Sequence, residues 1–436
     1  MNERMNRKDF LSLSFLLFAM FFGSGNLIFP PILGNQAAIS SFTALLGFLV
    51  TAVVIPVLGI LAVAKAGGVT NLGSRVGRYF SIIFPAIIFL SIGPGIAIPR
   101  NGSLAFEMSV APYLGESSNL LLIRLAYTLI FFAVAFYLCL TPSKLVDRIG
   151  KVLTPALLLL LVVFFLGAVI VLTSNVGPVN EAYSQPFING FLEGYNTMDA
   201  LASLNFGFVV ALAIRGFNIK NEKNIISYAS KAGLIAGILL AIIYAMLTYV
   251  GMISSADNQA AANGGTILFN VTNQVFGNLG SVVLILIFTL ACLTTVAGLI
   301  TSVSEYFAEL TKHKVNYKAW VTIFTLVSLV LANFGLDNIL VFSVPILMAI
   351  YPPAIVLIVL ALLQDKLNLS HISYKLTIYV TLFFSIIQGI ETAGISVPVL
   401  SEMTSKLPLY NAGLQWLVPA LIAFIVSLFI GKSKKK

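Results

Sequence analysis

Charged residues are scarce in this sequence, and so are cysteine and histidine. Only 9% of the 436 residues are charged and 59% are hydrophobic, whereas a soluble domain is typically about 25% charged. A soluble globule of this composition would expose too much apolar surface, and a disordered chain needs low hydrophobicity. Both classes are therefore excluded.

The few reactive side chains also exclude most enzyme chemistry. Cys139 and Cys292 lie in apolar runs, which is typical of small buried side chains, and two cysteines cannot build a disulfide framework. His313 and His371 fall in polar loops. The sequence has no HExxH motif, Cys/His cluster or P-loop, so metal-dependent hydrolysis and ATP-driven transport lack their residues. We expect that the protein is not an enzyme.

Long apolar runs are what the sequence has in abundance. About 20 mostly apolar residues make a membrane-spanning helix, and the candidate runs are 10–33, 39–64, 79–110, 119–140, 149–173, 187–214, 226–251, 279–310, 317–334, 338–363, 373–395 and 412–431. The first run follows basic residues as a signal peptide does, but it has no clean small-residue cleavage site, so we interpret it as a span. The sequence predicts an all-α polytopic membrane protein of about twelve spans, in a single transmembrane domain over residues 1–436.

The basic residues predict the orientation in the membrane. Apart from Arg100, Arg124 and Lys406, the 25 Lys and Arg residues lie at the two ends of the chain and in alternate loops. Positive charge collects on the cytoplasmic side of membrane proteins. The formal charge of +9 therefore reflects topology and not nucleic-acid binding. We expect a multi-pass plasma-membrane protein with both termini in the cytoplasm, and with the polar loop 252–278 outside, where there is room for a short helix.

Three runs carry polar residues near mid-depth, where such groups are costly and mark functional sites. The first is interrupted by Gly23, Ser24, Gly25 and Asn26, and Pro30–Pro31 are expected to end it. The sixth is interrupted by Gly194, Tyr195, Asn196, Thr197 and Asp199. For the lone carboxylate of Asp199, a structural and a functional role are both open.

The eighth run has adjacent hydroxyls, Thr294 and Thr295, beside Gly298. A span hydroxyl often bonds its own helix, but hydroxyl and carbonyl oxygens are also the ligands that hard cations prefer. Breaks in the first and sixth spans predict two repeats of opposite topology, residues 10–173 and 187–363, followed by two further spans in 373–431. Interrupted helices at corresponding positions of two halves point to the binding site of a secondary transporter.

Four segments resemble the bacterial branched-chain amino acid carriers, the BrnQ-type cation symporters. In order, they are FAMFFGSGNLIFPPILG, IGPGIAIPRNGSLAFEMSVAP, TPSKLVDRIGKVLTP and GFLEGYNTMDALASLNFG. The resemblance covers at least residues 15–310. It implies a LeuT-type 5+5 inverted-repeat fold with helices 1 and 6 broken, and uptake of leucine, isoleucine and valine with Na⁺ or H⁺.

A more distant similarity to LeuT-type transporters implies roles for single residues. The Gly-x-Gly-Asn segment 23–26 matches the break of their first helix, so the amides of Ser24 and Gly25 would hold the substrate carboxylate. Asn26 and Thr197 would lie near a second cation position, which could instead be absent or filled by a proton on Asp199. The expected substrate-binding residues are Gly23, Ser24, Gly25, Asn26, Tyr195, Asn196, Thr197 and Asp199. The expected Na⁺ ligands are Ala19, Phe22, Ala291, Thr294 and Thr295.

Arg100 and Glu107 are two charged residues within the third run. Seven residues apart, they share a helix face at a separation of about 10.5 Å, which is too far for a direct salt bridge. They are expected either to gate an outer vestibule or to snorkel toward the outer interface and pair with a neighbouring span.

The predicted function is secondary active import of branched-chain amino acids, coupled to Na⁺ or H⁺ by alternating access. One alternative is a transporter of the same fold that carries another amino acid or a nucleobase. Another is a passive channel or facilitator, although the polar groups cluster at mid-depth instead of lining a continuous pore. The expected partners are the substrate, the coupling cation and the lipid bilayer, with no cofactor other than that ion, no nucleic acid and no obligate protein partner.

Overall fold

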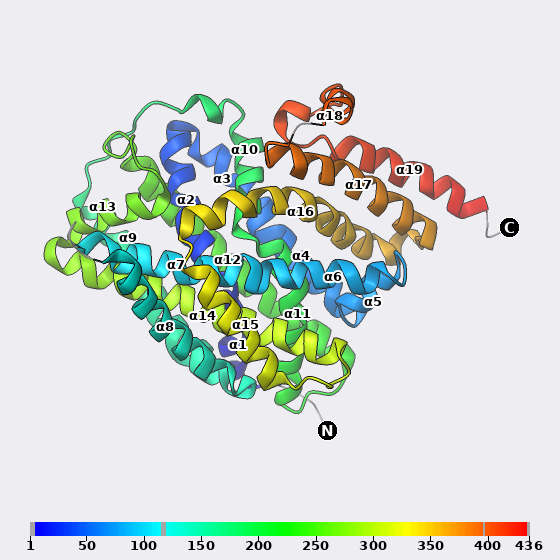
Figure 1. The fold of residues 1–436 in the computed structure, drawn as a ribbon, viewed down its shortest axis with the longest axis horizontal. Helices are drawn as coiled ribbons and strands as arrows, with labels where there is room; N and C mark the ends of the chain where they lie inside the picture. The colour runs from blue at the N-terminus through cyan, green and yellow to red at the C-terminus, as the bar shows by residue number, and fades with distance from the viewer. Residues whose placement is uncertain (1–4, 115–118, 396, 434–436) are drawn as a thin grey trace.

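The computed structural model describes residues 5–114, 119–395 and 397–433. Every regular element in these residues is a helix (Figure 1). The first half contains α1 (Arg7–Phe21), α2 (Ser24–Ala37), α3 (Ser41–Leu49), α4 (Ile55–Ala66), α5 (Val69–Ser74), α6 (Phe80–Leu90), α7 (Ala97–Ser109), α8 (Leu120–Cys139) and α9 (Thr154–Val171). The second half contains α10 (Pro186–Glu193), α11 (Asp199–Gly216), α12 (Glu222–Ile253), α13 (Gly264–Phe276), α14 (Gly280–Leu310), α15 (Tyr317–Ala332), α16 (Leu336–Leu367), α17 (His371–Thr392), α18 (Pro398–Ser405) and α19 (Leu417–Ser433).

The membrane-protein class is confirmed. Nine helical segments in the described part of the chain are long and apolar enough to cross a membrane. Two shorter apolar helices, Tyr317–Ala332 and Leu417–Ile430, fall in the ninth and twelfth predicted runs. The count of twelve spans and the division into two inverted repeats stay predictions.

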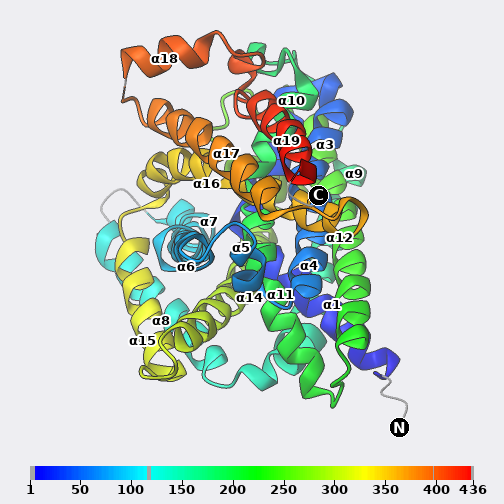
Figure 2. The same ribbon diagram turned by 90° about the vertical axis from the view of Figure 1, so that its right-hand side faces the viewer.

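The broken helices lie inside the bundle. Helix α1 packs against α12 and α14, α2 packs against α12, and α11 packs against α4. Helices α16, α17 and α19 form a layer at one side, where α17 and α19 run side by side (Figures 1 and 2). The outer helices expose large apolar side chains such as Leu121, Ile130 and Ile170, as lipid-facing helices do.

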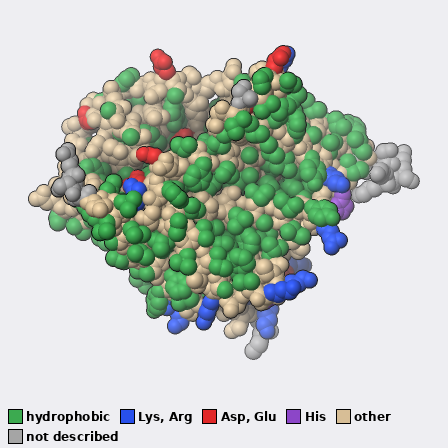
Figure 3. Space-filling view, in the orientation of Figure 1, with side chains coloured by type: hydrophobic (Ala, Val, Ile, Leu, Met, Phe, Trp, Pro, Cys, Tyr) green, Lys and Arg blue, Asp and Glu red, His purple; other side chains and the backbone are tan. Residues whose placement is uncertain are grey.

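The two ends of the molecule differ in charge. In Figure 3, Lys and Arg side chains gather along the lower and right-hand edges, and most Asp and Glu side chains lie toward the upper edge. The N-terminus lies at the same lower end in Figure 1. The predicted loop 252–278 contains a true helix, α13, which packs against α2 and α14.

The prediction that Pro30–Pro31 end the first run is wrong, because α2 continues through both prolines to Ala37. A proline inside a helix removes a backbone hydrogen bond, but membrane helices tolerate proline where neighbouring groups compensate for that loss. Helix α12 packs closely against this part of α2: a Cβ added to Gly251 of α12 would lie only 2.0 Å from the carbonyl oxygen of Pro31. This close backbone packing keeps α2 helical beyond its prolines.

Candidate substrate and cation site

The first helix break is shorter than the polar segment that predicts it. Only Phe22 (φ −76°, ψ 83°) and Gly23 (φ −116°, ψ −154°) leave the helical conformation between α1 and α2. Ser24, Gly25 and Asn26 form the first turn of α2. The Gly23 amide donates a hydrogen bond to Asn26 Oδ1 (3.0 Å). The polar residues of the segment therefore cap the restarted helix as well as facing the protein interior.

The second break lies between α10 and α11. Residues Gly194–Thr197 form a 3₁₀ turn, and Met198 adopts a left-handed conformation (φ 66°) before α11 begins at Asp199. A left-handed non-glycine residue is uncommon and is kept only when its surroundings fix it. The Thr197 hydroxyl donates to the Gly194 carbonyl (2.8 Å), which stabilises the turn. The predicted interruption of the sixth run is confirmed.

Helix α7 brings two polar side chains to these breaks. Arg100 Nε donates to Ser24 Oγ (3.1 Å), and Arg100 Nη1 donates to the backbone carbonyl of Asn196 (2.8 Å). Asn101 Oδ1 accepts a hydrogen bond from the Ser24 amide (2.8 Å). The Arg100 side chain is only 2% exposed. Arg100 thus connects the first break to the second, and Asn101 holds the first.

Asp199 accepts hydrogen bonds from two neutral side chains. Asn26 Nδ2 donates to Asp199 Oδ2 (2.7 Å), and the Tyr244 hydroxyl of α12 donates to the same oxygen (3.0 Å). Asn26 Nδ2 also lies against the Tyr244 hydroxyl oxygen. Asp199 is 1% exposed. These contacts give the carboxylate hydrogen-bond donors but no direct ion pair.

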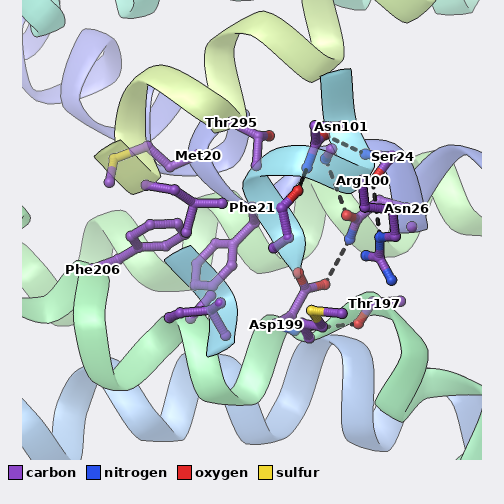
Figure 4. A pocket seen from close by; sticks show the side chains of 17 residues that line it. Met20, Phe21, Ser24, Asn26, Arg100, Asn101, Thr197, Asp199, Phe206 and Thr295 are labelled. Atoms are coloured by element: carbon purple, nitrogen blue, oxygen red, sulfur yellow. Dashed lines mark hydrogen bonds between the residues drawn. The ribbon is translucent and has the colours of Figure 1, made fainter. Parts of the chain in front are cut away.

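The two breaks and α7 surround a narrow cavity of about 20 Å³, which has room for about one water molecule. Figure 4 shows its two sides: Met20, Phe21 and Phe206 lie at one side, and polar residues lie at the other. The polar lining residues are Ser24, Asn26, Arg100, Asn101, Thr197, Asp199 and Thr295. A lining of this kind suits a small ligand that has one charged or polar end and one apolar end, and the cavity has to widen to admit it.

A second group of oxygens lies where α1 ends against α14. In a continuous helix, the Ala19 carbonyl would accept from the Gly23 amide, but that amide bonds Asn26 instead. The released carbonyl of Ala19 lies 2.9 Å from Thr295 Oγ1 and 3.3 Å from Thr294 Oγ1. Thr294 Oγ1 is also 3.1 Å from the Ala291 carbonyl oxygen. The break thus creates a cluster of four neutral oxygens, a donor set suited to an alkali cation.

The structure brings most of the predicted site residues together. Of the predicted site residues, those that line the cavity are Gly23, Ser24, Gly25, Asn26, Thr197, Asp199 and Thr295. Tyr195 and Asn196 belong to the second break but do not line the cavity: the Tyr195 ring stacks on Tyr351 with 4.2 Å between centroids, and the Asn196 carbonyl meets Arg100. Phe22 lies at the first break, and its ring stacks on Phe18. The ligand roles of all these residues stay predictions.

Arg100 is the lining residue whose position the sequence reasoning missed. It does not snorkel to the outer interface, because it is buried between the two breaks. Glu107, its predicted companion, lies 3.8 Å from Arg124 Nη2 of α8 and accepts from the Leu336 amide (2.9 Å). Glu107 therefore pairs with a neighbouring helix, which was the second of the two expectations for this residue. The sequence signal for Arg100 was the Gly- and Pro-rich segment IGPGIAIPRNG, which bends the chain just before it.

Solved structures with the same fold are transporters. The chain superposes on a Na⁺-coupled sialic acid symporter with a TM-score of 0.60 at 14% identity, covering 97% of this chain and 90% of that one. It superposes on Mhp1, a nucleobase-cation-symport-1 family transporter, with a TM-score of 0.59 at 13% identity, covering 96% and 91%. At such low identity the likeness shows the fold alone, and it confirms the LeuT-type fold class.

Sequence comparison identifies the family. The chain is 43% identical to the branched-chain amino acid permease BraB of Bacillus subtilis, over 100% of this chain and 99% of the relative. It is 41% identical to the branched-chain amino acid transport system 2 carrier protein of Pseudomonas aeruginosa, over 96% and 95%. The family model described as branched-chain amino acid transport protein matches residues 6–434. The chain therefore belongs to the branched-chain amino acid transport protein family.

Proposed function

We propose that this protein imports leucine, isoleucine or valine into the bacterial cell together with one Na⁺ ion. The observation that carries the proposal is the division of the central cavity, with Arg100, Asp199 and amide groups at one side and Met20, Phe21 and Phe206 at the other. A branched-chain amino acid has the same division, since a zwitterionic end is joined to an aliphatic side chain. The names of the relatives from Bacillus subtilis and Pseudomonas aeruginosa support this substrate class.

The cluster of Ala19, Ala291, Thr294 and Thr295 is the proposed Na⁺ site. All four oxygens are neutral, and the C-terminal end of α1 adds partial negative charge from the helix dipole. In the described residues, no group of three or more His, Cys, Asp or Glu side chains could hold a metal ion. A monovalent cation fits this donor set better than a divalent one, which favours carboxylates. A proton is the alternative coupling ion.

The route to the cytoplasm is proposed to run along the ends of α1, α11 and α14. A second hollow of about 600 Å³ lies there, lined by Leu16, Val209 and Thr301 together with residues 142, 143 and 145–147. Asp147 and Arg215, from predicted cytoplasmic loops, also line it. The central cavity is lined by the same three helices. Movement of α1 relative to α11 and α14 would connect the two spaces, so we place the exit at this end.

One cation supplies enough energy for strong accumulation. Moving one charge through 100 mV gives about 2.3 kcal/mol, and a tenfold Na⁺ gradient adds about 1.4 kcal/mol. Together these support roughly 500-fold accumulation of the substrate. A one-cation symporter of this kind needs no second energy source.

Uptake by the purified protein in proteoliposomes tests this function. We expect an inward Na⁺ gradient to drive [¹⁴C]leucine above its equilibrium level, and unlabelled isoleucine and valine to compete. Uracil is the control competitor and should have no effect. Uptake that only equilibrates under both Na⁺ and H⁺ gradients would indicate a facilitator, and competition by uracil would indicate another substrate class.

A further inference from the structure

We infer that Arg100 and Asp199 are the two charge receptors of the substrate: Arg100 binds its carboxylate and Asp199 binds its ammonium group. This inference rests on the proposed function and names the contacts that select an α-amino acid. It differs from the role implied by the LeuT-type resemblance, in which the backbone amides of Ser24 and Gly25 hold the substrate carboxylate.

The first step is that both charges are buried and neither is in direct contact with a charge of opposite sign. Arg100 is 2% exposed and Asp199 is 1% exposed. Among the described residues, the ion pairs involve other side chains throughout. Arg100 and Asp199 attract each other, but a buried charge without a counter-charge in direct contact still destabilises the protein. Hydrogen bonds from Asn26 and Tyr244 reduce this cost for Asp199 but do not neutralise it.

The second step is that both side chains line the same cavity. Figure 4 shows them on the polar side, with Arg100 beside Ser24 and Asp199 near Thr197. An amino acid carries its carboxylate and its ammonium on a single carbon atom. One zwitterion would therefore give each buried charge its missing partner, whereas a ligand with only one charge would leave the other unpaired.

The third step is that two backbone groups at the breaks are already occupied. The Ser24 amide donates to Asn101 Oδ1 (2.8 Å), and the Asn196 carbonyl accepts from Arg100 Nη1 (2.8 Å). By contrast, the Arg100 guanidinium donates to Ser24 and Asn196 through its Nε and Nη1 atoms. Its Nη2 atom lies over Gly25, where an added Cβ would be 2.7 Å away. A planar guanidinium is suited to forked recognition of a carboxylate.

Paired ligands separate the two receptors in a binding experiment on the full-length protein. Leucinol keeps the ammonium and side chain of leucine but replaces the carboxylate with a neutral hydroxymethyl group. 4-Methylpentanoate keeps the carboxylate and lacks the ammonium. Affinities are measured by competition with [³H]leucine, or by calorimetry where leucine no longer binds, at constant Na⁺. Each of these two ligands lacks one charge of leucine and leaves one buried receptor unpaired. The wild-type protein should therefore bind each of them about 30-fold or more weakly than leucine.

The variants Arg100→Gln and Asp199→Asn then test each contact. We expect Arg100→Gln to weaken leucine by about 30-fold or more while leucinol changes by less than about threefold. Asp199→Asn should weaken leucine similarly and leave 4-methylpentanoate nearly unchanged. Arg124→Gln is the matched control, because Arg124 pairs with Glu107 outside the cavity. It should leave unchanged both the ratio of leucine affinity to leucinol affinity and the ratio of leucine affinity to 4-methylpentanoate affinity.

If Arg100→Gln does not fold, the variant Arg100→Lys, which retains the positive charge, can be measured in its place. Arg100→Lys should lower leucine affinity selectively, because a point charge loses the forked contact. If leucine and leucinol weaken by the same factor in the arginine variants, Arg100 only shapes the cavity and the inference is wrong. If Asp199→Asn still prefers leucine over 4-methylpentanoate as strongly as the wild type does, Asp199 is not the ammonium receptor. A wild-type protein that binds no branched-chain amino acid would contradict the proposed function and this inference together.

Discussion

Arg100 Nη1 donates a 2.8 Å hydrogen bond to the backbone carbonyl of Asn196, so a charged side chain of α7 reaches the turn that interrupts the sixth predicted run. The same guanidinium donates to Ser24 Oγ at the start of α2. The Arg100 side chain is therefore hydrogen-bonded to both helix breaks. A change in the distance between the breaks must stretch or break one of these two bonds, which makes Arg100 a sensitive point for substitutions around the cavity.

Gly25→Ala should disturb this connection directly. The added Cβ would lie 2.7 Å from Arg100 Nη2 and 3.1 Å from the Asn196 carbonyl oxygen. We expect leucine affinity to fall by about tenfold or more, because overpacking forces the guanidinium or the turn to move. Gly233→Ala is the control, since its nearest neighbour would be Ile60 at 3.4 Å. Wild-type affinity in a well-folded Gly25→Ala protein would show that this contact is not needed for binding.

Thr294→Ala combined with Thr295→Ala tests the cation site. Both hydroxyls lie against the Ala19 carbonyl oxygen, and losing them removes two of the four clustered oxygens. The Na⁺ concentration that half-saturates uptake should rise on the order of tenfold or more. Thr289→Ala serves as the control, because Thr289 is on the same helix but bonds Tyr127. An unchanged Na⁺ dependence in the double variant would remove these residues from the coupling mechanism.

Tyr244→Phe tests how Asp199 is held. The Tyr244 hydroxyl donates to Asp199 Oδ2 (3.0 Å), and the carboxylate would lose one of its two neutral donors. Removing a donor from a buried charged group should cost about 1–3 kcal/mol of stability, seen as a lower midpoint in thermal unfolding without substrate. Tyr228→Phe, whose hydroxyl accepts from the Met5 amide at the chain's N-terminal end, should change the midpoint much less. Equal midpoints for the two variants would contradict this account.

Gly251→Ala tests the packing that carries α2 through its prolines. The added Cβ would lie 2.0 Å from the Pro31 carbonyl oxygen, and backbone atoms cannot move aside as a side chain can. We expect a loss of stability of about 1–3 kcal/mol or more and a lower yield of folded protein. Gly77→Ala meets nothing within 4 Å and should behave like the wild type. A fully stable Gly251→Ala protein would show that α2 and α12 can separate freely.

The two helix breaks could be predicted from the sequence because their residues are unusual for a membrane span. Glycine beside Ser24 and Asn26, and a lone Asp199, have few explanations at mid-depth other than a site. The end point of the first helix could not be predicted in the same way. Whether Ser24 unwinds or begins α2 depends on the hydrogen bond that its amide donates to Asn101, a residue 77 positions away.

The position of Arg100 shows where sequence reasoning stops. A charged residue inside an apolar run can snorkel, pair or line a cavity, and the choice depends on the direction in which the helix faces. That direction is set by the kink before α7, where Gly93 leaves the helical conformation (φ −87°, ψ −125°). Tertiary packing also decides the course of α2 at Pro30 and Pro31. Neither effect is visible in the local pattern.

The leucine gradient that stops net flux tests coupling between the two sites most directly. Proteoliposomes with a fixed tenfold Na⁺ gradient and no membrane potential are given increasing opposing leucine gradients. One Na⁺ per leucine predicts that net [¹⁴C]leucine flux reverses at a leucine gradient of about tenfold. A flux that reverses where the leucine concentrations are equal, whatever the Na⁺ or H⁺ gradient, would contradict coupled transport through this cavity.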